Sequence, residues 1–174
     1  MVSKSIIHVI GLNLTVYGLD EYEDLPKGTP VTVLFALHGR LQNQDKMEPI
    51  SQAICRLNNQ YQNGNRYIIV VTFDAPNHGS RLVNKLSNHT WMEGPHRNPH
   101  HALDMWTLVV SMSQTVTELI DVLEFYLFKD ASKSLVEVWG VLGFSMGGHA
   151  TFLAAANGIA LSRACGHCFI SVPY

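Results

Sequence analysis

The stretch from Val136 to Ala156, VEVWGVLGFSMGGHATFLAAA, holds the pentapeptide Gly143–Gly147 (GFSMG) between two different patterns. The residues before it, VEVWGVL, form an apolar run with the length of a buried strand. The residues after it, GGHATFLAAA, are small and favour a short helix. A strand, a sharp turn and a helix in this order hold the serine in a strained conformation with its hydroxyl exposed. We therefore predict that Ser145 lies at the carboxyl edge of a sheet.

The rest of the chain alternates between strand and helix patterns. This alternation predicts the α/β class, with a mostly parallel sheet and helices on both of its faces. The predicted strands are Ile6–Tyr17 (broken at Gly11), Val31–Leu37, Tyr67–Phe73, Val136–Leu142 and His167–Val172. The predicted helices carry the apolar stripes Met47, Ile50, Ile54, Leu57 and Tyr61, then Met105, Leu108, Met112, Val116, Leu119, Leu123 and Leu127, and a third helix covers Gly148–Asn157.

Composition limits the classes of function. Of the 174 residues, 47% are hydrophobic and 15% are charged, which predicts one folded domain spanning residues 1–174. The net charge of −2, without a cluster of Lys and Arg, argues against nucleic acid as a partner. No apolar run at the start has the length of a signal peptide or a membrane span, so we expect no membrane partner and a cytoplasmic location.

Two of the three cysteines lie in the motif Cys165–Cys168 (CGHC), which has the spacing of a redox dithiol. In redox proteins the first cysteine opens a helix, whose N-terminus lowers the pKa of the thiol. Here the motif is followed by FISVPY, which has the pattern of a strand. We expect these cysteines to be buried structural residues, with a redox or metal-binding role as the alternative.

Three polar sites follow predicted strands, where ligands bind in parallel α/β sheets. They are His38-Gly39, Asp74 and Ser145. The helix after Ser145 directs its first N–H groups toward the serine, so the Met146 N–H is a candidate donor to an oxyanion.

These residues resemble the α/β-hydrolase superfamily, whose nucleophile lies in a Gly-x-Ser-x-Gly turn between a strand and a helix. Phe73–Arg81 (FDAPNHGSR) is similar to the D-x-x-x-H-G-x-R loop of a carboxylesterase-like branch with bacterial and fungal members. The fungal members are also similar to this chain in the stretch NHGSRLV and in an HA-x-DM motif at His101–Met105. The resemblance extends over nearly all of the chain.

The resemblance implies an α/β-hydrolase fold and hydrolysis of a small-molecule carboxylic ester, with no cofactor and no metal. It implies that Ser145 is the nucleophile. It also implies an oxyanion hole made by the backbone N–H groups of Arg40 and Met146, because the loop after His38 has the place of the superfamily's oxyanion loop. The residues expected in the loops around the pocket are His38, Gly39, Asp74, His78 and Trp91.

The chain departs from this family after Ser145. The superfamily order is nucleophile, acid, histidine, but no Asp or Glu follows Ser145, and the only later histidines are His149 and His167. The chain ends in Val172–Tyr174 (VPY), where the fungal relatives have Pro-Asp-Tyr. We therefore expect a domain that is incomplete after its sixth strand and has weak or no activity. The alternative is a non-catalytic module that binds acyl ligands. The exposed last strand predicts self-association.

Two further arrangements remain open. Ser145, His78 and Asp74 would form a triad in an unusual order, because roles rather than sequence order define a triad. Arg81 would then be placed to pair with the Asp74 carboxylate.

Residues 74–103 are predicted to form an inserted lid or wall, with Trp91 in contact with the substrate. A metal-dependent hydrolase is the alternative for this loop, whose candidate ligands are His89, Glu93, His96, His100 and His101.

Overall fold

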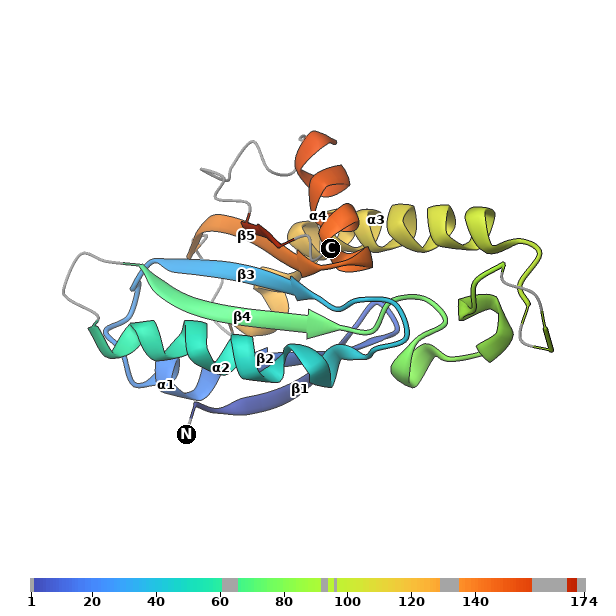
Figure 1. Ribbon diagram of the computed structural model, residues 1–174. Coiled ribbons are helices and arrows are strands. Elements are labelled where there is room, and N and C mark those ends of the chain that lie inside the picture. Colours follow the sequence, from blue (N-terminus) through green and yellow to red (C-terminus); the bar gives the residue numbers. More distant parts are fainter. Residues whose placement is uncertain are drawn as a thin grey trace.

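The computed structural model describes residues 2–60, 66–91, 94–95, 97–128, 135–157 and 169–171. One central sheet has helices on both sides (Figure 1). The strands are β1 (Lys4–Val9), β2 (Leu12–Tyr17), β3 (Val31–Leu37), β4 (Tyr67–Phe73), β5 (Val136–Phe144) and β6 (Phe169–Ser171). The helices are α1 (Leu19–Glu23), α2 (Glu48–Cys55), α3 (His101–Leu127) and α4 (Met146–Ala156), and short 3₁₀ turns cover Gln44–Met47, Arg56–Gln60, Gly79–Arg81 and Lys85–Asn88.

The sheet has the strand order β1-β2-β4-β3-β5-β6. β4, β3, β5 and β6 run parallel, whereas β2 is antiparallel to both β1 and β4, so the prediction of a mostly parallel sheet is confirmed. The first two strands form a hairpin whose turn residues, Ile10 and Gly11, both have positive φ, as a type I′ turn requires. Leu37 at the end of β3 lies opposite Gly143 of β5. This register brings the loops after β3 and β5 to the same edge of the sheet.

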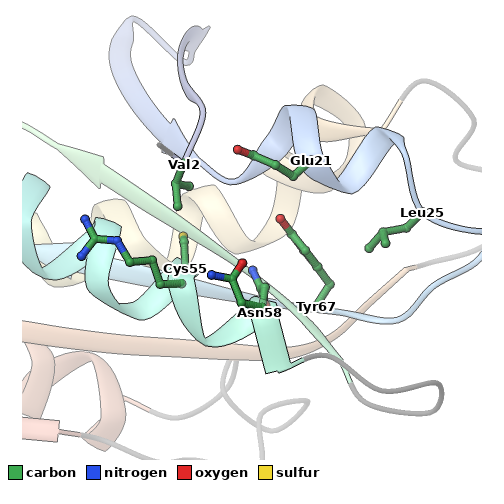
Figure 2. Close-up of a pocket in the computed structure, with 8 residues that line it drawn as sticks. Val2, Glu21, Leu25, Cys55, Asn58 and Tyr67 are labelled. Atoms are coloured by element: carbon green, nitrogen blue, oxygen red, sulfur yellow. The ribbon is translucent and has the colours of Figure 1, made fainter.

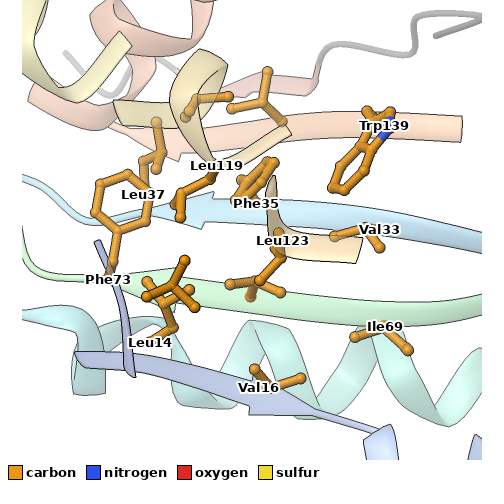
Figure 3. Packing of buried hydrophobic residues seen from close by; sticks show 14 of the residues in the cluster. Leu14, Val16, Val33, Phe35, Leu37, Ile69, Phe73, Leu119, Leu123 and Trp139 are labelled. Atoms are coloured by element: carbon orange, nitrogen blue, oxygen red, sulfur yellow. The ribbon is translucent and has the colours of Figure 1, made fainter. Parts of the chain in front are cut away.

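The alternation of side chains along β3 explains its continuous apolar sequence. Its odd-numbered residues face the larger core under α3 and α4, and Leu34 and Ala36 face the smaller core under α2. A strand that is buried on both faces needs apolar residues at every position. Figure 3 shows Leu119 and Leu123 of α3 packed near Phe35 in the larger core.

The apolar stripe predicted for α3 is confirmed, because Met105 is half-buried and the other six residues are buried. The helix begins at His101, so the preceding loop ends at residue 100 rather than 103. The Asn98 side chain accepts a hydrogen bond from the His100 N–H (3.0 Å) and donates to the Asp104 carboxylate (2.8 Å). These bonds, with an acidic residue in the first turn, favour a helix start at this point.

The stripe predicted for α2 is wrong in part. Ile50 and Leu57 are 44% and 55% exposed, while Met47, Ser51 and Cys55 are buried at four-residue steps. The α-helix changes to a tighter 3₁₀ turn after Cys55, and Leu57 lies in that turn. The remaining predicted features of this segment, Tyr61, Asn63 and Gly64, lie outside the described residues.

The C-terminal elements are close to the prediction. α4 begins at Met146, directly after Ser145 and two residues before the predicted start at Gly148. Within the predicted strand His167–Val172, residues Phe169–Ser171 pair parallel with β5. The motif Cys165–Cys168 lies outside the described residues. Among the helices that the structure describes, none is both long and apolar enough to cross a membrane.

Candidate active site

Ser145 occupies the turn between β5 and α4. Its backbone has φ 53° and ψ −112°, the predicted strained conformation for a residue with a side chain. A Cβ atom on Gly143 would collide with the backbone of Gly147, and one on Gly147 would collide with the carbonyl oxygen of Leu37. These glycines let α4 start directly against the ends of β5 and β3. Ser145 is exposed, and its hydroxyl has no hydrogen-bond partner within the described part of the chain.

The loop after β3 forms a tight turn over residues 39–42, beside the Ser145 turn. The Gln42 N–H donates to the Gly39 carbonyl (3.2 Å), and Leu41 has φ 63°. A Cβ on Gly39 would lie 3.0 Å from the Phe144 ring, so the two turns are in contact. Among residues 39–42 the Arg40 N–H alone has no acceptor in the described structure. It is therefore open to an acceptor on a bound molecule.

The buried Asp74 carboxylate, at the end of β4, joins the loops after β3 and β4. One oxygen accepts from the Gln44 N–H (2.8 Å), and the other accepts from the N–H and the hydroxyl of Ser80 (both 2.8 Å). A Cβ on Gly79 would collide with this carboxylate, which explains the glycine with φ 50° there. Arg81 donates to the Asp74 backbone carbonyl (3.0 Å), so the predicted pairing with the carboxylate is wrong.

The buried imidazole of His78 is bonded through both ring nitrogens. Nδ1 lies 2.9 Å from the Pro76 carbonyl oxygen, and Nε2 accepts from the Leu41 N–H (3.1 Å). Neither Asp74 nor Ser145 is bonded to this ring. The alternative triad of Ser145, His78 and Asp74 is therefore not assembled in this structure.

His38 is fully buried and has a matching set of partners. Nδ1 lies 2.8 Å from the Gly39 carbonyl oxygen, and Nε2 accepts from the Ala75 N–H (3.0 Å). Burial lowers the pKa of His38 below its usual value, so the ring is neutral at neutral pH. The hydrogen bond to the Gly39 carbonyl and the Asp74 carboxylate, 4.0 Å from Nε2, raise this pKa and offset the effect of burial only in part.

His149 lies on the first turn of α4 and is exposed. Its Nδ1 is 2.9 Å from the Ser145 carbonyl oxygen, to which the His149 N–H also donates (3.1 Å). The ring is thus bonded to the backbone of the serine rather than to its hydroxyl. In the described part of the chain, no imidazole is hydrogen-bonded to the Ser145 hydroxyl.

Asparagine side chains hold the loop after β4 in shape, and the sequence analysis missed them. Asn77, with φ 57°, accepts from the N–H groups of Val83 (2.9 Å) and Asn84 (2.7 Å) and donates to the Asn88 side chain (2.9 Å). The Arg40 side chain donates to the Asn88 carbonyl (2.8 Å) and ties this loop to the turn over residues 39–42. The sequence feature that predicts their role is the recurring asparagine in NHGSRLVNKLSNHT, because asparagine side chains bond to nearby backbone groups in turns.

Trp91 is 62% exposed and packs edge-on against His101, with 4.8 Å between ring centroids. Its contact with a substrate remains a prediction.

Within the described residues there is no group of three or more metal-binding side chains. Two members of the predicted histidine-rich cluster, Glu93 and His96, lie outside those residues.

A hollow of about 450 Å³ lies at the opposite end of the sheet (Figure 2). Tyr67 at the start of β4 and Cys55 at the end of α2 line it, together with Glu21 of α1. Burial raises the pKa of the Cys55 thiol to about 12, so this thiol is protonated and unreactive at neutral pH. This hollow contains none of the residues predicted for the site, since Ser145, His38 and Asp74 all follow the carboxyl ends of strands.

No protein-family model matches the sequence, and no curated protein matches it. The structure is similar to TT1662 from Thermus thermophilus, with 19% identity, a TM-score of 0.57 and coverage of 91% of this chain and 52% of that one. The chain has the α/β-hydrolase fold. It is also similar to DphMB1 (15% identity, TM-score 0.50, 96% and 42% covered) and to the epoxide hydrolase VrEH1 from Vigna radiata (17% identity, TM-score 0.49, 99% and 41% covered).

The chain spans about half the length or less of these solved structures. At these identities the similarity concerns the fold. The chemistry has to be argued from the residues of this chain.

Proposed function

We propose that this chain carries the nucleophile and the oxyanion hole of a serine hydrolase that acts on carboxylic esters. The observation that carries the proposal is Ser145, exposed on a strained turn at the N-terminus of α4. Strain of this kind persists where the surrounding structure enforces it, and it clusters at active sites. Here Gly143 and Gly147 enforce it through their close approach.

The proposed reaction begins with attack of the Ser145 Oγ on the ester carbonyl carbon. A C–O bond forms as the carbonyl π electrons move to oxygen, and the serine proton passes to a base. The oxyanion accepts from the Arg40 N–H and the Met146 N–H, the latter unpaired at the first position of a helix. The alcohol then leaves with a proton, and water hydrolyses the acyl-serine.

No described histidine is hydrogen-bonded to the Ser145 hydroxyl, and His38, His78 and His149 are bonded to backbone groups instead. Serine hydroxyls are weak nucleophiles without an adjacent base. We therefore expect the chain alone to be weak or inactive as an esterase. A module that binds acyl ligands without turnover is the second candidate, favoured by the lack of any hydrogen bond between a described imidazole and the Ser145 hydroxyl.

The proposal is tested by adding imidazole to the solution as a general base. The purified chain is treated with an alkyl fluorophosphonate with and without imidazole, and the adduct on the Ser145 peptide is measured by mass spectrometry, with Ser145→Ala as the control. We expect slow labelling that imidazole accelerates at least about tenfold, since a positioned base contributes about 10²–10⁴-fold. p-Nitrophenyl acetate hydrolysis without imidazole should be no faster than in Ser145→Ala.

Labelling of Ser145 at the rate of other exposed serines, with imidazole present, would contradict the hydrolase proposal and support the binding module. Fast ester hydrolysis by the chain alone would show that a base is already in place.

A further inference from the structure

His38 and His78 form a reciprocal pair between the loops after β3 and β4. His38, in the first loop, accepts from the Ala75 N–H in the second (3.0 Å). His78, in the second loop, accepts from the Leu41 N–H in the first (3.1 Å). The two rings are in contact, with 5.4 Å between centroids, and both are buried. Each histidine thus holds the loop to which the other belongs.

The partners determine the protonation of both rings. A backbone N–H can only donate, so each Nε2 must be an unprotonated acceptor. A carbonyl oxygen can only accept, so Nδ1 must carry the proton in His38, facing Gly39 (2.8 Å), and in His78, facing Pro76 (2.9 Å). Both rings are therefore neutral and in the Nδ1–H tautomer.

These bonds act on the two peptide groups that flank Arg40. The Gly39 carbonyl and the Arg40 N–H belong to one planar peptide group, so the bond from His38 to that carbonyl orients the N–H. The Leu41 N–H belongs to the next peptide group, which His78 holds. Leu41 has φ 63°, a conformation that costs free energy for leucine and needs such support.

Protonation would break this arrangement, because an imidazolium has no acceptor nitrogen. The charged groups around the pair are Asp74, whose carboxylate is 4.0 Å from His38 Nε2, Arg81, which donates to the Asp74 carbonyl, and Arg40, which donates to Asn88. The pKa of His38 is lowered by burial, so the unfolded chain binds this proton more readily than the folded chain. This contribution to stability is therefore fully present above pH 6.5, the ordinary pKa of the unfolded chain, and is lost as the pH falls through the lower pKa of folded His38.

We infer that His38 and His78 are positioning residues that hold the Arg40 N–H at the oxyanion site, and that acid releases this N–H by protonating His38. The inference rests on the proposed function for the role of Arg40. The loop order itself is measurable without any reaction at Ser145.

The experiment measures both rings and both amides by NMR. Long-range ¹H–¹⁵N spectra at neutral pH should show the Nδ1–H tautomer for His38 and His78. Hydrogen exchange, corrected for intrinsic rates, should show Leu41 and Ala75 protected at pH 7.5, and Ala75 should lose at least about tenfold protection as the pH falls through the folded-state pKa of His38. An Nε2–H tautomer in either ring, or protection of Ala75 that is independent of pH, would overturn the inference.

Variants separate the acceptor role of the His38 ring from its titration. Gln at position 38 offers an acceptor that does not titrate, so His38→Gln should keep the Ala75 N–H protected at neutral pH and abolish its acid sensitivity. His38→Leu should lose this protection at every pH. The exposed His8 is the matched control, and His8→Gln should behave as the wild type. Acid sensitivity that persists at Ala75 in His38→Gln would contradict the inference even if His38→Leu fails to fold.

Fluorophosphonate labelling of Ser145 in His38→Gln links the loop to the site. As the pH falls from 7.5 through the folded-state pKa of His38, the rate of labelling should fall less in this variant than in the wild type. If Ser145 is never labelled, the hydrolase proposal fails while the tautomer and exchange results still decide the inference.

Discussion

The two ends of the sheet bury their polar groups to different extents. At the carboxyl end, His38, Asp74 and His78 are buried, and each bonds to backbone N–H groups of another loop. At the amino end, Glu21 and Asn58 line the hollow in Figure 2, and they also bond to backbone groups but are only half-buried. The polar groups at the carboxyl end are thus shielded from solvent, whereas those at the amino end border an open hollow.

Backbone strain is also concentrated at the carboxyl end. In the described residues, the non-glycine positions with positive φ are Ile10, Leu41, Asn77 and Ser145, and the last three all lie in the loops after β3, β4 and β5. The strained positions therefore coincide with the loops of the proposed site, and the hollow does not.

The largest effect is expected at the close approach of β5 and α4. Gly143→Ala should prevent folding or cost more than about 3 kcal/mol, because its Cβ meets the backbone of Gly147, which cannot move aside. Gly140→Ala on the same strand is the matched control. Its Cβ meets only the end of the Leu34 side chain, at 2.9 Å, so it should cost under about 1.5 kcal/mol in urea denaturation. Equal losses of stability in the two variants would contradict the inference that the Ser145 turn depends on the absence of a Cβ at Gly143.

The amino-end hollow should be chemically inert. With a thiol pKa of about 12 instead of 9.0, Cys55 has about 1000-fold less thiolate than an ordinary cysteine at pH 8. Native iodoacetamide alkylation of the Cys55 peptide, followed by mass spectrometry, should be slower than in urea by at least that factor. A native rate within tenfold of the unfolded rate would show a reactive thiol and weaken the contrast between the two ends.

Strain in the turn over residues 39–42 should be measurable as a change in the free energy of unfolding. Leu41 is 59% exposed and has φ 63°, so Leu41→Gly should raise the free energy of unfolding by about 1 kcal/mol, despite the greater freedom of glycine in the unfolded chain. Leu82 is 50% exposed in the neighbouring loop with an ordinary φ of −69°, and Leu82→Gly should destabilise by about 1 kcal/mol. Destabilisation of similar size in both variants would mean that the Leu41 conformation carries little strain.

The smallest effect on stability is expected at Trp91. Because the side chain is 62% exposed, Trp91→Ala should change the free energy of unfolding by less than about 1 kcal/mol. The concentration of fluorophosphonate needed to half-saturate labelling of Ser145 should rise several-fold. Trp106 on α3 is equally exposed, and Trp106→Ala should leave labelling unchanged. A large loss of stability in Trp91→Ala would mean that this residue supports the loop rather than a substrate.

The strands were the most predictable part of the fold. Val31–Leu37 and Tyr67–Phe73 match the observed strands at both ends, because a strand that is buried on both faces is apolar at most of its positions. The buried face of α2 was not predictable in the same way. Ser51 is fully buried there because its hydroxyl bonds to the Met47 carbonyl (2.8 Å), which a count of apolar residues does not detect.

The sequence by itself determined the α/β class, the Ser145 turn and the glycines that permit it, because these depend on short-range patterns. Only the tertiary structure decided what each histidine does. Each of His38 and His78 accepts a hydrogen bond from an N–H that lies 37 residues away in the sequence. An imidazole can act as a base, a metal ligand or a backbone acceptor, and only folding brings it to the partner that selects among these roles.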